Sequence, residues 1–136
     1  RCDARFMSEV GVPGASSVEI LEKYKGDCKL LPAADTNPYW RSVNWWLQWD
    51  EYLAKGGNPD DMDGYVSWSQ RRQSDGLAIA LRKNKARFPS CGGFIIWMGH
   101  DCFPCPINTS IIDFEGNPKP AAFEVSEIWK TAPDKL

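Results

Sequence analysis

The stretch RFMSEVGVPG at residues 5–14 contains the pattern of a strand that ends beside an acidic residue. A short apolar run, Phe6-Met7, is followed by a single carboxylate, Glu9, and then by a glycine- and proline-rich turn at residues 11–14. This order is typical of a strand that ends in a loop and presents an acidic side chain there. In barrel enzymes the catalytic residues stand at such strand ends. Read alone, the stretch also fits a solvated Glu beside a turn, since Glu is seldom buried.

Two later stretches have a related pattern. The first, GGFIIWMGHDCFP at residues 92–104, contains a continuous apolar run at residues 94–98, as expected of a parallel strand covered on both faces. That run contains Trp97 near its end, and His100 and Asp101 follow it. The second, TSIIDFEGNPKPAA at residues 109–122, predicts a shorter strand or extended piece at 109–114, a turn, and a last helix that starts at Pro120.

Helical patterns fill the chain between these stretches. Ser16 and Glu19 form a capping box, which predicts a short helix that ends near Gly26. Residues 40–55 predict a second helix, because Trp45, Trp49 and Tyr52 recur at helical spacing. That helix either buries its aromatic stripe or has one or two of Trp40, Trp45 and Trp46 at a binding site.

A third and longer helix is predicted from a cap at Asp60 or Asp61 to about Arg87, with a break near Gly76 as an alternative. Placed between two strands, this helix is the crossover that returns the chain to a parallel neighbour. The last helix is expected to bury Ala121, Val125, Ile128 and Trp129, and residues 133–136 to form a frayed tail.

Size and composition limit the possible partners. The 136 residues suffice for one domain, and 43% hydrophobic and 25% charged residues are ordinary globular values. A net charge of −2 indicates no nucleic-acid partner, and no apolar run approaches the roughly 20 residues of a membrane span. No signal peptide is visible, so the compartment stays unknown, and a periplasmic or secreted location is compatible with the sequence.

The five cysteines are an odd number, so they cannot all pair within one chain. Cys102 and Cys105 have CxxC spacing, but a single His and no second Cys pair accompany them, whereas zinc usually takes four ligands. We therefore predict packed, reduced thiols, no metal site and no cofactor.

Together the three stretches resemble the C-terminal part of the catalytic barrel of family 2 glycoside hydrolases, the group of β-galactosidases, β-glucuronidases and β-mannosidases. That family has an F-x-S-E-x-G strand, then a G-x-x-x-W-x-x-x-D-x-x-P strand, and then an I-x-D-x-x-G-x-P-K-P-A segment that closes the barrel. Residues 6–11, 93–104 and 111–121 match these motifs in the same order.

The resemblance implies an α/β fold: the C-terminal fragment of a (β/α)8 TIM barrel, with few short parallel strands and several helices. A complete barrel needs about 250 residues, or about 200 at minimum, so residues 1–136 are expected to form a single partial domain. The remainder of the parent barrel is then a partner. Exposed strand edges also predict self-association into a homo-oligomer.

The resemblance further implies a retaining glycosidase that acts on a glycoside or oligosaccharide, closer to β-mannosidases or β-galactosidases than to glucuronidases. Glu9 is then the nucleophile, and the acid/base carboxyl lies outside this chain, which is expected to be inactive alone. Trp97 forms the floor of the sugar subsite. His100 departs from the Asn that often precedes this Asp in the family, and Asp101 either binds a sugar hydroxyl, orients a neighbour or stabilises a turn.

The sequence is also compatible with two other classes of protein. A carbohydrate-binding module would use Trp45, Trp49 and Trp97 as stacking residues, although such modules are mostly β-sandwiches and this chain has long helical patterns. A small helical interaction protein would explain the aromatic helices but not the three ordered motifs.

Overall fold

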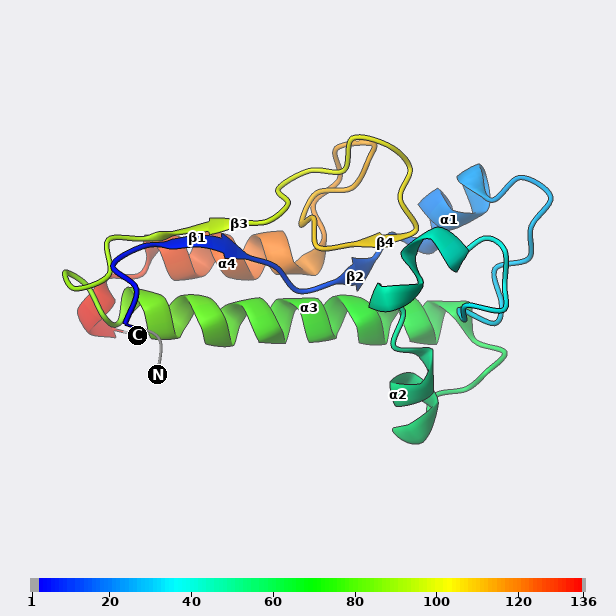
Figure 1. The fold of residues 1–136 in the computed structure, drawn as a ribbon, viewed down its shortest axis with the longest axis horizontal. Coiled ribbons are helices and arrows are strands. Elements are labelled where there is room, and N and C mark those ends of the chain that lie inside the picture. The colour runs from blue at the N-terminus through cyan, green and yellow to red at the C-terminus, as the bar shows by residue number, and fades with distance from the viewer. Residues whose placement is uncertain (1–2, 136) are drawn as a thin grey trace.

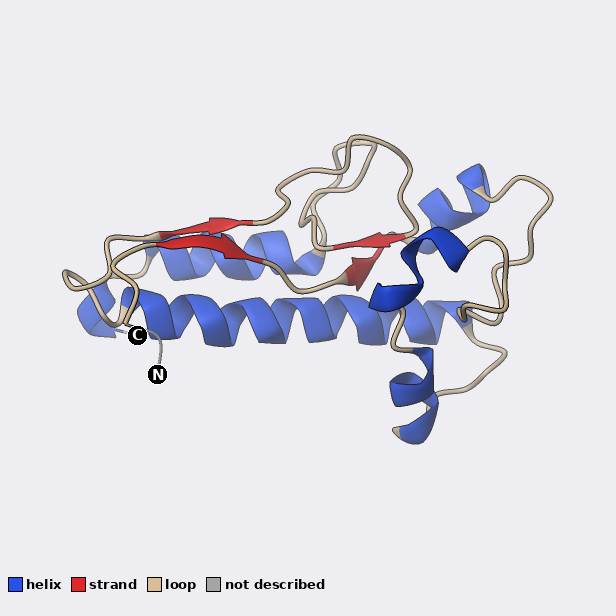
Figure 2. Cartoon of the chain, in the orientation of Figure 1, coloured by secondary structure: helices blue, strands red, loops and turns tan. Residues whose placement is uncertain are grey.

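The computed structural model describes residues 3–135, whose arrangement is shown in Figure 1. In chain order its elements are β1 (Met7–Val10), β2 (Gly14–Ala15), α1 (Val18–Tyr24), η1 (Arg41–Trp46), α2 (Trp49–Ala54), α3 (Met62–Lys85), β3 (Phe94–Ile96), β4 (Ile107–Asn108), α4 (Pro120–Lys130) and η2 (Pro133–Lys135). The two η elements are 3-10 helices. Several helices and a few short strands are present, in agreement with that part of the predicted fold class (Figure 2).

The strands form two separate pairs. β1 pairs with β3 in parallel, and β2 pairs with β4 in the antiparallel sense. α3 connects the first pair, so the chain returns to a parallel neighbour through a helix, as predicted. In Figure 1, α3 and α4 lie along one side of β1 and β3.

Apolar packing forms two clusters that share α3. The C-terminal half of α3 packs with β1, β3 and α4 through a set of small and aliphatic residues: Val10, Leu77, Ala78, Leu81, Ile111, Ala121, Val125 and Ile128. The N-terminal half contributes Tyr65 to an aromatic cluster around the fully buried Trp40. α3 is therefore the element that connects the strand pair to the Trp-rich segments.

The first helix is capped by a different serine from the one predicted. Ser17 is the N-cap of α1, and its hydroxyl accepts a hydrogen bond from the amide of Ile20 at 3.4 Å. Ser16 is buried, and its hydroxyl donates to the carbonyl oxygen of Cys105 at 2.7 Å. The prediction of Ser16 as the cap is wrong because that hydroxyl holds the loop before β4.

Residues 40–55 do not form the single helix that was predicted. η1 and α2 are separated by Gln48, which has a left-handed conformation with φ 55°. A residue at such a φ interrupts a right-handed helix. The aromatic stripe is split as a result: Trp49 and Tyr52 are buried, whereas Trp45 is 67% exposed.

α3 confirms the predicted crossover helix. Asp61 is its N-cap, with a carboxylate oxygen that accepts from the amide of Gly64 at 2.9 Å. The helix continues through Gly76 without a break. A Cβ at Gly76 would lie 3.1 Å from a methyl group of Val12, so this glycine allows the loop after β1 to approach the helix.

The extended piece predicted at residues 109–114 contains isolated bridges, not a strand. Ile112 bridges His100 and Pro118, and the regular strand β4 lies just before this piece. α4 starts at Pro120 as predicted and buries Ala121, Val125 and Ile128. The prediction is wrong for Trp129, which is 52% exposed: it stands in the last turn of α4, where, among the described residues, only Phe94 stacks on its ring, at a centroid distance of 5.6 Å.

In the tail, Pro133–Lys135 form the 3-10 turn η2, and Leu136 lies outside the described residues. Cys28, Cys91, Cys102 and Cys105 have free thiols, while Cys2 also lies outside the described part. Within residues 3–135 no group of three or more His, Cys, Asp or Glu side chains comes together to hold a metal ion. None of the described helices has the length and apolar character to span a bilayer.

Candidate active site

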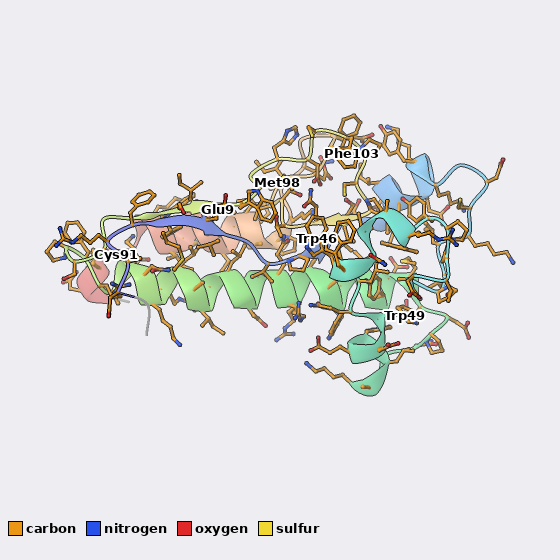
Figure 3. All side chains as sticks on the ribbon, in the orientation of Figure 1. Glu9, Trp46, Trp49, Cys91, Met98 and Phe103 are labelled. Atoms are coloured by element: carbon orange, nitrogen blue, oxygen red, sulfur yellow. The ribbon has the colours of Figure 1, made fainter. Side chains whose placement is uncertain are left out.

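The parallel pair β1–β3 brings Glu9 and Trp97 to the same place. Val10 lies opposite Ile96, and the amide of Trp97 donates to the carbonyl oxygen of Val10 at 2.8 Å. Because the two strands run in the same direction, Glu9 and Trp97 stand at their shared carboxyl-terminal end, where barrel enzymes have their catalytic residues. Figure 3 shows Glu9 at this end, with Met98, the residue after Trp97, close by.

An irregularity in β1 sets the direction of the Glu9 side chain. Met7 pairs with Phe94 and Val10 with Ile96, so three steps along β1 match two steps along β3. Met7 and Val10 both pack toward the helices, which leaves Ser8 and Glu9 exposed on the other side. Bulges of this kind often re-aim a side chain next to an active site. The sequence contains no signal for this bulge.

One face of the strand pair is covered by helices, and the other is open. Phe94 and Ile96 pack against α3 and α4, while Ile95 is 56% and Trp97 is 45% exposed. By strand alternation Ile95 and Trp97 lie on the same face as each other. Parallel strands are normally covered on both faces, so the open face with Glu9 and Trp97 departs from the usual arrangement.

The two strand-end loops are packed tightly against each other. A Cβ at Gly11 would lie 2.5 Å from the carbonyl oxygen of Trp97, which is closer than real Cβ contacts come. The amide of Met98 donates to Oγ1 of the buried Thr109 at 3.0 Å, and the peptide bond between Trp97 and Met98 is cis. Only glycine at position 11 permits this approach, which keeps Trp97 beside the end of β1.

The two polar residues predicted after Trp97 have different surroundings. His100 is exposed at an isolated bridge, in the loop that follows Trp97. Asp101 is only 1% exposed; its Oδ1 accepts from Nδ2 of Asn108 at 3.0 Å, and its Oδ2 lies 3.8 Å from Nζ of Lys119. This geometry favours the structural alternative for Asp101 over direct contact with a sugar hydroxyl.

Trp45 lies on a different surface from Glu9 and Trp97. Its ring packs edge-on against Trp46 at a centroid distance of 5.5 Å. It lines a cavity of about 350 Å³ together with polar residues that include Asp35, Asn44, Gln48 and Asp50, and neither Glu9 nor Trp97 belongs to that lining. η1, the cyan segment in Figure 1, lies beyond the carboxyl ends of β1 and β3. The structure thus joins Glu9 with Trp97 and leaves Trp45 at a distance in the fold.

The stacking set of a carbohydrate-binding module is incomplete in this structure. Trp49 is buried and packs against Tyr52 and Tyr65, at centroid distances of 5.4 and 5.2 Å. A residue in that position cannot stack on a sugar. The described strands are also short and outweighed by helices, unlike a β-sandwich.

A larger cavity, of about 610 Å³, lies at the amino-terminal end of the strands. Its lining includes Phe6, Phe88, Phe94 and Trp129 and contains no Asp or Glu. Without a carboxylate this cavity lacks the groups that hydrolysis of a glycosidic bond requires. Its size alone does not make it the reactive site.

Two further buried polar side chains, Gln73 and Lys119, for which no role was predicted, hold residues 12–14 to Ser110, which follows β4. Nε2 of Gln73, from α3, donates to the carbonyl oxygens of Val12 and Ser110, each at 3.0 Å. Nζ of Lys119 donates to the carbonyl oxygen of Gly14 at 3.0 Å and to Oγ of Ser110 at 3.3 Å. Gln73 lies four residues before Leu77 on the buried stripe of α3, and a polar residue at such a position is a signal that sequence inspection can detect.

Comparison with known proteins gives partial matches. No protein-family model matches the chain. β-Mannosidase B from Emericella nidulans and from Aspergillus oryzae are each 30% identical to it over 73 residues, which is 52% of this chain and 8% of theirs. A solved β-D-mannosidase from Dictyoglomus thermophilum superimposes with a TM-score of 0.72 and 24% identity, over 92% of this chain and 16% of that one. The structural likeness shows the fold alone, and the matched region is a small part of each relative.

Proposed function

Since the similarity to β-mannosidases supports the assignment of this chain to glycoside hydrolase family 2, we propose that it forms part of a retaining β-glycosidase in which Glu9 is the nucleophile. The observation that supports this most is the position of Glu9. It is an exposed carboxylate beside Trp97, at the carboxyl end of two parallel strands whose outer face is covered by helices.

The proposed architecture is the last part of a (β/α)8 barrel. β1 with α3 and β3 with α4 are two successive strand–helix units, with the strands parallel and the helices on one side. The open face of β1 and β3 then points to the barrel interior. Residues 1–136 form one partial domain that needs the remaining strands of the parent barrel.

The proposed chemistry is a double displacement. Glu9 attacks the anomeric carbon and forms a covalent glycosyl-enzyme, while a second carboxyl group protonates the leaving oxygen and later activates water. In retaining enzymes the two carboxyl groups stand about 5–5.5 Å apart across the bond that is cleaved. The rest of the barrel supplies the second group, so this chain alone does not turn over substrate.

The proposed substrate is a terminal β-mannoside, with a β-galactoside-like sugar as the alternative. The relatives named β-mannosidase favour the first. The half-exposed ring of Trp97 offers an apolar surface for the C–H face of a pyranose, and His100 at the rim is available for a hydroxyl. Glu9 and Trp97 are thus the residues we propose to contact the sugar that is released.

The test compares two glutamate variants in the full-length protein that contains this chain. Glu9→Gln should reduce the hydrolysis of an aryl β-mannoside by at least about 1,000-fold, because the nucleophile is lost. Glu127→Gln, on the exposed side of α4, should keep wild-type turnover. Wild-type turnover by Glu9→Gln would refute the proposed role of Glu9.

A further inference from the structure

We propose that Lys119 is a positioning residue: its buried ammonium group fixes the loop after β3, which contains Trp97, against the segment of residues 11–15, which follows Glu9 and includes β2. The proposal rests on the proposed function in one respect, namely that Glu9 and Trp97 act on the same sugar. It assigns a role to a residue that does not itself touch substrate.

Lys119 contacts both segments at once, through Gly14 in β2 and Asp101 in the loop after β3. It is the N-cap residue of α4 and is 3% exposed. Its Nζ donates to the carbonyl oxygen of Gly14, five residues after Glu9, at 3.0 Å, and to Oγ of Ser110 at 3.3 Å. The same Nζ lies 3.8 Å from Oδ2 of Asp101, a distance that makes an ion pair and not a hydrogen bond.

A continuous path of hydrogen bonds leads from Asp101 back to Trp97. Oδ1 of Asp101 accepts from Nδ2 of Asn108 at 3.0 Å, and Oδ1 of Asn108 accepts from the amide of Thr109 at 2.8 Å. Oγ1 of Thr109 then accepts from the amide of Met98, directly after Trp97, at 3.0 Å. Asp101, Asn108 and Thr109 are all buried, so water does not compete for these bonds.

Burying an ammonium group costs desolvation free energy, so stability alone does not explain Lys119. Burial lowers the pKa of Lys119, while the Asp101 carboxylate beside it opposes that shift. Well-packed apolar residues of similar volume often stabilise a fold as much as a buried ion pair does. They cannot, however, donate to the carbonyl oxygen of Gly14 and pair with Asp101 together. The charge and the three polar contacts therefore fit a residue that keeps the two segments in one fixed relative position.

The test uses two variants designed to separate stability from positioning. Lys119→Met alone leaves the Asp101 charge buried and unpaired, so it should lower the denaturant midpoint. The double variant Lys119→Met/Asp101→Asn removes both charges and should recover much of that midpoint. Its kcat/KM on an aryl β-mannoside, measured in the full-length protein, should still be reduced by about 100-fold, because the link between the two segments is lost.

Lys130→Met is the matched control, since Lys130 is an exposed lysine on the same helix. It should leave both the midpoint and kcat/KM at their wild-type values. If the double variant recovers stability and also regains kcat/KM within about twofold of wild type, Lys119 acts only in stability and the proposal is wrong.

Hydrogen exchange measured on the same proteins separates this proposal from the proposed function. In the double variant, amides of residues 10–15 and of residues 97–109 should both exchange faster than in wild type. Faster exchange confined to the first turn of α4 would refute the coupling. Should the wild-type protein hydrolyse no β-glycoside, the proposed function fails, and the exchange result still decides whether Lys119 connects the two segments.

Discussion

At the scale of single residues, Glu9 and Trp97 have clear environments. Both project from the open side of a parallel strand pair, and the backbone of one strand end is hydrogen-bonded to the other through Val10 and Trp97. Gly11 permits the close approach of the two loops. These contacts place a carboxylate and an aromatic side chain at the same end of the strand pair.

The stacking role of Trp97 can be tested against a second tryptophan with similar exposure. Trp97→Ala in the full-length protein should lower kcat/KM on an aryl β-mannoside by about 10- to 100-fold, because the sugar loses an apolar contact surface. Trp129→Ala, at the far end of the strand pair, should change kcat/KM by less than about threefold. Equal losses in the two variants would contradict the assignment of Trp97.

Cys105 provides a pH-dependent test of the packing around the loop after β3. Desolvation, helped by the nearby Asp101 charge, raises the pKa of the Cys105 thiol to about 11 from an ordinary value of 9.0. The folded state therefore keeps a proton that the unfolded state releases, and this stability is present below about pH 9 and is lost as the pH rises through about 11.

Chemical denaturation at several pH values between 8 and 10.5 measures this effect. Between these pH values the unfolding free energy of wild type should decline more than that of Cys105→Ala. The two declines should differ by an amount of order 1 kcal/mol. The comparison of this variant with wild type is needed because Lys119, whose pKa is lowered by burial, contributes with the opposite sign. Parallel pH curves for the two proteins would show that Cys105 is not protonated in the way described.

Sequence patterns identified some of these residues and not others, for physical reasons. Glu9 and Trp97 follow apolar strand runs, and that order is visible in the chain. The exposed direction of Glu9 depends on a bulge that arises from pairing with β3, a non-local contact. The burial of Asp101 likewise depends on Lys119 and Asn108, whose approach no local pattern indicates.

At the scale of elements, α3 organises the fold. Its two halves belong to two different apolar clusters, so it connects the strand pair to the Trp-rich region. The sequence predicted this helix well because its cap, length and apolar stripe are local features. The prediction for residues 40–55 was wrong: the aromatic spacing indicated one helix, but Gln48, with its positive φ, separates η1 from α2.

The contribution of α3 to stability can be measured with two apolar residues on opposite sides of the helix. Leu77→Ala should reduce the free energy of unfolding by about 2–5 kcal/mol, because Leu77 is fully buried between the strands and α4. Ile79→Ala should cost less than about 0.5 kcal/mol, since Ile79 is 59% exposed. Urea titration of both variants tests the expected burial pattern, and similar losses would contradict it.

At the scale of the whole molecule, the open face of β1 and β3 is the feature that most needs explanation. On this face of the described chain Ile95 and Trp97 are exposed. Among the described strands β1 and β3 pair only with each other, so each also has one edge without a neighbouring strand. Such surfaces pair readily with other chains. Figures 1 and 3 show the helices on the other side of the strands.

We therefore predict that this 136-residue chain self-associates when it is produced without the remaining strands of the proposed barrel. Sedimentation velocity at rising concentration should detect dimers or larger species, and Ile95→Lys should reduce them. Ile79→Lys is the control, because Ile79 is about as exposed but lies on α3, away from the open face. A monodisperse monomer at every concentration would argue against an accessible, adhesive sheet face.

If Glu9 is the nucleophile of a retaining glycosidase, as we propose, it can be trapped as a covalent glycosyl-enzyme. The full-length protein is incubated with a 2-deoxy-2-fluoro-β-mannosyl fluoride, and the intact mass and the peptide map are measured. The tryptic peptide of residues 6–23 also contains Glu19 and Glu22, so fragmentation must locate the label within it. We expect one added sugar on Glu9; a label on another residue, or continued hydrolysis with Glu9 unlabelled, would show that Glu9 is not the nucleophile.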